Sequence, residues 1–92
     1  MEQNVLEERP RAVQTRFELA AGRMVESWIA AGRMCVSAGD MRLAREFLET
    51  AGWTIHDAPG ARVRLVSRAG RAQEMTREAA VLLALRRLAA RD

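Results

Sequence analysis

The chain contains no lysine and no tyrosine, and among its 92 residues it has one cysteine, one histidine and two prolines. A single cysteine cannot form an intramolecular disulfide, and one cysteine with one histidine supplies too few ligands for an ordinary zinc site. We therefore expect no metal and no cofactor. The longest apolar runs, such as residues 79–85, fall far short of the roughly 20 residues of a membrane span. The opening Met-Glu-Gln-Asn also lacks the basic start of a signal peptide, so we expect a cytoplasmic protein without a membrane partner.

Hydrophobic residues make up 49% of the chain and charged residues 29%. This is enough apolar material to avoid the composition of a disordered chain. A chain of this length holds one hydrophobic core. We predict a flexible tail at residues 1–9 and a single domain over residues 10–92.

All 15 basic residues are arginines, and the 12 acidic residues leave a formal net charge of +3. Abundant alanine, arginine and glycine without lysine indicate a GC-rich genome, bacterial or phage. The excess of positive charge lies in residues 53–92, which hold eight arginines and four acids. Arginine presents a planar, permanently charged donor group that fits phosphate and carboxylate. The C-terminal part is therefore a candidate surface for an anionic partner.

Residues 11–35 have the apolar spacing of an amphipathic helix. Pro10 suits a first helical turn, Gly22 offers a break and Gly32 an end, which leaves one helix or two open. Further apolar residues off the main stripe, at Leu19, Val25, Ile29 and Val36, predict packing inside the fold or pairing with a second copy. The cysteine thiol is expected to be buried and inert. The residues that we expect at a dimer or partner interface are Phe17, Met24, Trp28, Ala31 and Cys35.

A second helix is predicted over residues 40–51, with Ser37 or Asp40 as its N-cap and Gly52 as a left-handed stop. The apolar period then changes to two, which predicts a β-hairpin with strands near residues 53–56 and 62–65 and a turn at residues 57–60. A short third strand is expected at residues 72–75. Thr76 caps a final helix, whose predicted core residues are Val81, Leu82, Leu85, Leu88 and Ala89.

The predicted fold class is α+β, with two to three N-terminal helices, a β-hairpin or three short strands, and one C-terminal helix. Residues 43–55 followed by residues 59–66 resemble the recognition helix, glycine stop, strand and basic wing tip of bacterial winged helix-turn-helix regulators. The resemblance implies a winged-helix-like domain that binds double-stranded DNA and regulates transcription, usually as a homodimer. The arginines that would contact nucleic acid, or an acidic partner, are Arg62 and Arg64 on the wing, Arg68 and Arg71 beyond it, and Arg42 and Arg45 on the helix.

The second predicted helix also has acidic residues at Asp40, Glu46 and Glu49, where a helix in the major groove normally presents arginine, amides or hydroxyls. The alternative is a protein-binding module, an antiactivator, adaptor or phage-type inhibitor. It would dock on one larger protein through the apolar N-terminal helix or the basic hairpin. No nucleophile with an adjacent base and no glycine-rich phosphate loop is evident. We expect neither an enzyme nor a small-molecule substrate.

Overall fold

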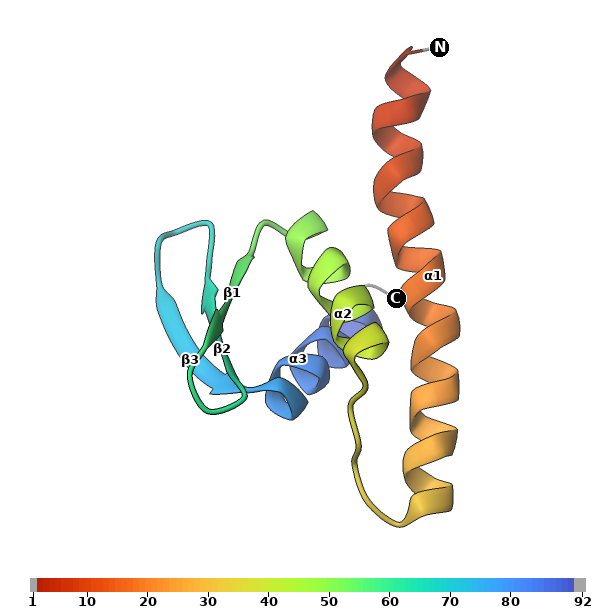
Figure 1. The fold of residues 1–92 in the computed structure, drawn as a ribbon. Helices are drawn as coiled ribbons and strands as arrows, with labels where there is room; N and C mark the ends of the chain where they lie inside the picture. The colour runs from red at the N-terminus through yellow and green to blue at the C-terminus, as the bar shows by residue number, and fades with distance from the viewer. Residues whose placement is uncertain (1, 91–92) are drawn as a thin grey trace.

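The computed structural model describes the backbone of residues 2–90 and the side chains of residues 10–90. The predicted α+β class is confirmed, with two N-terminal helices, three antiparallel strands and a C-terminal helix (Figure 1). No helix in this part of the chain is long and apolar enough to cross a membrane. The elements are α1 (Glu2–Ala31), α2 (Ala38–Thr50), β1 (Thr54–Ala58), β2 (Arg62–Val66), β3 (Ala72–Thr76) and α3 (Arg77–Ala90).

The first helix, α1, is continuous over 30 residues, and its N-terminal half projects beyond the rest of the fold (Figure 1). It begins at Glu2, so residues 2–9, which we predicted as a tail, are helical, and Pro10 lies inside the helix instead of opening it. Gly22 does not break it. The end at Gly32 is confirmed, because this residue has a φ of 70°. The N–H groups of Gly32 and Arg33 donate to the carbonyls of Ile29 and Trp28, which closes the helix on a left-handed residue.

Both residues predicted as caps of α2 take part in its N-terminus. Ser37 Oγ accepts from the Asp40 N–H at 3.0 Å, and Asp40 Oδ2 accepts from the Ser37 N–H at 3.4 Å, a reciprocal capping box. The helix stops at Gly52, which has a φ of 95°, and the Trp53 N–H returns to the Leu48 carbonyl at 3.1 Å. Thr76 caps α3 as predicted, since its Oγ1 accepts from the Ala79 N–H at 3.1 Å.

The three strands form an antiparallel sheet in the order β1-β2-β3. β1 extends through Ala58, so the tight turn is at residues 59–61 and not at 57–60. The inner face buries Ile55, Val63 and Leu65 against the helices. Because side chains alternate along a strand, the residues between them point to the outer face, which is largely exposed.

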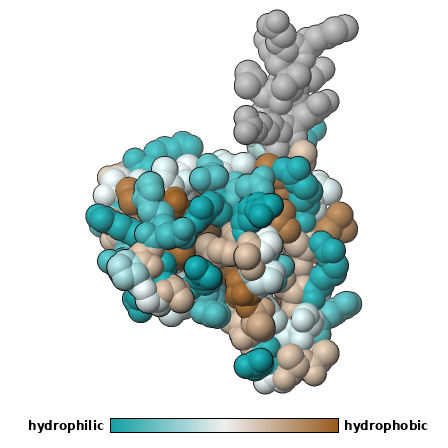
Figure 2. Space-filling view, in the orientation of Figure 1, coloured by the Kyte–Doolittle hydropathy of each residue, from teal (hydrophilic) through white to brown (hydrophobic). Residues whose placement is uncertain are grey.

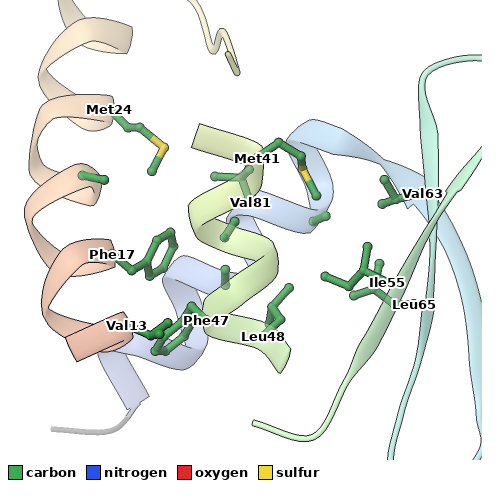
Figure 3. Packing of buried hydrophobic residues seen from close by; sticks show 14 residues of the cluster. Val13, Phe17, Met24, Met41, Phe47, Leu48, Ile55, Val63, Leu65 and Val81 are labelled. Carbon is green, nitrogen blue, oxygen red and sulfur yellow. The ribbon is translucent and has the colours of Figure 1, made fainter. Parts of the chain in front are cut away.

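The core lies around α2, which packs against α1 on one side and against α3 and the sheet on the other (Figure 3). The Phe17 and Phe47 rings stack with centroids 4.8 Å apart. On α3, Val81 is buried as predicted, but Leu82 is 41% exposed, and Ala80 and Ala84 are buried in its neighbourhood. Ala89, also predicted in the core, is exposed, while Leu85 and Leu88 are half-buried. Alanines form part of the buried face of α3, so the positions of the large apolar side chains alone do not identify that face.

Candidate nucleic-acid interface

Arg62 and Arg64 lie on the outer face of β2, the central strand of the sheet. Their positions follow from the core, because Val63 and Leu65 between them are fully buried and successive side chains on a strand point to opposite faces. Both arginines are exposed. In the view of Figure 2, hydrophilic side chains dominate the surface over the sheet, and apolar patches appear over the helices. The structure thus confirms that these two predicted residues share one solvent-facing surface.

The strands that flank β2 add one histidine and one carboxylate to this face. Arg64 is in register with His56 on β1 and with Glu74 on β3. Glu74 Oε1 lies 3.9 Å from Arg62 Nε, and both side chains are about half exposed or more. An exposed ion pair of this kind contributes only about 0–1 kcal/mol, so Arg62 can exchange the carboxylate for another anion. Arg64 has no ion pair within the described residues.

The turn between β2 and β3 presents Arg68 and Arg71. Ser67 holds this turn: its N–H donates to the Arg71 carbonyl at 2.8 Å and its Oγ accepts from the Arg71 N–H at 3.1 Å. The Arg68 guanidinium turns back onto Gly52, where Nε lies 2.8 Å from the position that a Cβ would occupy. That location is the C-terminus of α2, whose dipole favours a cation. Of the two, Arg71 is the one without such a helix-end contact.

Arg42 and Arg45 do not join the outer face of the sheet. They lie on α2, and Arg45 Nη2 contacts Asp57 Oδ1 of β1 at 3.0 Å. Asp57 is in register with the buried Val63 and therefore belongs to the inner-face side of the edge strand. The six predicted arginines consequently form two surfaces, one on the sheet with its β2–β3 turn and one on α2.

The surface on α2 includes a small pocket of about 230 Å³, which we call the basic pocket. It is lined by Ala38, Met41, Arg42 and Arg45 of α2, Asp57 of β1 and Arg77 of α3. Sequence reasoning missed Arg77. One signal was present: an arginine in the first turn of a helix opposes the helix dipole, so the dipole of α3 does not account for its position there.

The residues predicted at a dimer or partner interface are divided between the core and the surface. Phe17 and Met24 are buried within the chain itself, at 0% and 3% exposure, so they pack in the intramolecular core. Trp28 is half-buried, and its Nε1 donates to the Cys35 carbonyl at 2.7 Å, which fixes the α1–α2 loop. Ala31 and Cys35 are exposed. The prediction of a buried thiol is wrong because Cys35 lies beyond the end of α1, where the helical period no longer applies.

Comparison of this chain with protein-family models, with curated proteins and with solved structures finds no match. The resemblance to winged helix-turn-helix regulators therefore stays a prediction. Within residues 10–90, no group of three histidine, cysteine, aspartate or glutamate side chains is placed to hold a metal ion. The positions of the chain's own arginines are therefore the features that indicate a function.

Proposed function

We propose that the protein is a small cytoplasmic regulator that binds double-stranded DNA through Arg62 and Arg64, with Arg71 as an additional contact. The observation that carries this proposal is the pair of exposed arginines on the central strand. Two residues along a strand span about 7 Å, a separation comparable to that of neighbouring phosphates on one nucleic-acid strand. The guanidinium groups are suited to phosphate because they donate in a planar fork and stay charged.

The neighbours of these arginines favour contacts to the phosphate backbone over contacts to bases. Thr54, Ala58 and Thr76 occupy the outer face near them, and none is an amide or an arginine that reads base edges in pairs. Phosphate contacts position a protein on a duplex without reading its sequence. We therefore expect binding with strong dependence on salt and little preference for sequence.

The test is fluorescence anisotropy of a labelled GC-rich duplex titrated with the full chain at about 50 and 200 mM salt. The variant Arg62→Gln with Arg64→Gln removes two positive charges from the sheet. It should weaken binding and lower the slope of log affinity against log salt by about 1.8, at 0.9 per phosphate contact. The charge-matched control is Arg86→Gln with Arg87→Gln, which removes two exposed arginines from α3.

The control variant should bind as the unchanged protein does. Equal weakening by both double variants would mean that net charge, and not the sheet surface, drives binding. Absence of binding by the unchanged protein at the lower salt would contradict the proposal outright.

A second candidate function, docking of another protein molecule, is favoured by the exposed apolar residues of α1. Leu19 is 66% exposed, Ile29 76% and Val25 41%. Val25 and Ile29 are four residues apart and therefore lie on the same side of the helix. The occupant that we propose is a second copy of the chain, and its oligomeric state in solution is the test.

A further inference from the structure

The basic pocket has an excess of positive charge over negative charge. Three guanidinium groups from two helices line it, against the single carboxylate of Asp57. Arg45 is paired with that carboxylate, and within the described part of the chain Arg42 and Arg77 have no ion pair. The larger open groove between α1 and α2, about 580 Å³, has three arginines but also two acids, Asp40 and Glu46. The basic pocket is thus the more positive of the two.

Two helices begin at this pocket, which adds to its positive potential. Ala38 is the first residue of α2 and Arg77 the first residue of α3, and both line the pocket. Figure 1 shows these two helix starts at the same end of the molecule. The N-terminus of a helix carries a partial positive charge, and here side-chain caps already bind the N–H groups of Asp40 and Ala79. An arginine placed there is repelled unless negative charge offsets it, and the acidic residues of the two first turns, Asp40 and Glu78, supply part of that charge.

We infer that the basic pocket binds a phosphate-type oxyanion, the terminal phosphate of a phosphomonoester. A volume of about 230 Å³ lies below the 300–1,000 Å³ that is usual for sites that enclose a larger ligand, so the pocket takes the phosphate and little else. Phosphate is an anion that converging arginines and helix N-termini bind well. This inference does not depend on the proposed DNA contacts, because Arg62 and Arg64 lie on the opposite face of the sheet.

The experiment is an NMR titration of the full ¹⁵N-labelled chain with inorganic phosphate, with sodium chloride at the same ionic strength as reference. We expect saturable shifts confined to the amides of residues 38–40 and 77–79, and none of this pattern with chloride. Arg77→Gln should lower the affinity for phosphate about tenfold or more, since a charge-assisted contact of this kind is lost. Arg23→Gln is the control, because this exposed arginine lines the other groove.

Chemical-shift changes that do not saturate with phosphate, or that are equal with chloride, would overturn the inference. A folded Arg77→Gln variant that binds phosphate as well as the unchanged protein would overturn it too. Dispersion of the variant's spectrum reports whether it is folded. The Arg62→Gln, Arg64→Gln variant should bind phosphate normally, so failure of the DNA proposal and failure of this one are distinguishable.

Two sources can present such a phosphate, a small phosphorylated compound and the end of a nucleic-acid strand. A second titration compares glucose 6-phosphate with a short oligonucleotide that carries either a 5′-phosphate or a 5′-hydroxyl. Shifts at the pocket that require the 5′-phosphate identify the nucleic-acid end. Shifts with glucose 6-phosphate but not with the phosphorylated oligonucleotide identify a small ligand. If neither phosphomonoester shifts the pocket amides, the inference is wrong.

Discussion

Ala61, in the turn between β1 and β2, is in a backbone conformation that favours glycine. Its φ is 58°, and it is the non-glycine residue with positive φ in the described chain. The left-handed region costs an L-residue about 1–2 kcal/mol, a cost that glycine avoids. Part of this gain is offset because glycine has more conformational freedom to lose from the unfolded state. We predict that Ala61→Gly raises the free energy of unfolding by about 0.5–1 kcal/mol, measured from the urea midpoint.

The neighbouring turn provides the control for that prediction. Ala69 is also an exposed turn alanine, but its φ is not positive, so Ala69→Gly gains no relief of strain. It should leave the free energy of unfolding unchanged or lower it slightly. Stabilisation by both substitutions would show that strain at Ala61 is not the cause.

The sequence identified some site residues but not their partners. Arg62 and Arg64 could be placed on one exposed face because a strand has a period of two, which is a local property. The Arg45–Asp57 contact joins residues twelve apart on different elements, and it depends on how α2 packs against β1. Arg77 reaches the basic pocket for the same reason. The local sequence pattern predicts on which face of a helix or strand a residue lies. The packing of the elements against one another decides which residues its side chain contacts.

The glycines of α1 give a matched pair at the scale of a helix. Gly22 lies in the middle of α1 and Gly32 at its end, with φ of 70° only at Gly32. A Cβ at either position would meet nothing within 4 Å, so only the backbone differs. We predict that Gly22→Ala raises the free energy of unfolding by about 0.5–1 kcal/mol and that Gly32→Ala lowers it by a similar amount. Thermal unfolding followed by circular dichroism measures both, and the same sign for both would contradict the assignment of the helix end.

Element types and caps could be predicted from sequence better than element lengths and faces. The glycine stops, Ser37 and Thr76 depend on chemistry within a few residues, and the structure confirms each of them. The length of α1 could not be predicted in this way, because Pro10 and Gly22 both favour a boundary that the helix passes through. The face of α3 was also obscure, since alanine is buried there and Leu82 is exposed.

At the scale of the whole molecule, the three proposed surfaces lie on different elements. The outer face of the sheet carries Arg62 and Arg64, the basic pocket opens between α2 and α3, and the exposed apolar residues lie on α1. The outer face belongs to β2, the basic pocket is lined by residues of α2, β1 and α3, and the exposed apolar residues belong to α1. Variants on one surface should therefore leave the others intact, which allows each proposal to be tested in the same full-length chain.

The apolar side of α1 leads to the prediction that the protein is a dimer. Single exposed apolar residues are ordinary on a protein surface, but here Val25 and Ile29 lie four residues apart on one side of α1, and Leu19 is exposed on the same helix. We expect a dimer in sedimentation velocity, and a folded monomer for Val25→Gln with Ile29→Gln. Leu82→Gln is the control, since Leu82 is 41% exposed, as Val25 is, but lies on α3.

Dimerisation would also change how the protein binds DNA. A dimer brings two sheet surfaces to one duplex, and each phosphate contact adds about 0.9 to the slope of log affinity against log salt. The Val25→Gln, Ile29→Gln variant should therefore bind with about half the slope of the unchanged protein, although its arginines are intact. An unchanged slope in a monomeric variant would mean that each copy binds DNA alone. A monomeric unchanged protein at the highest concentration examined would instead contradict the pairing of α1 itself.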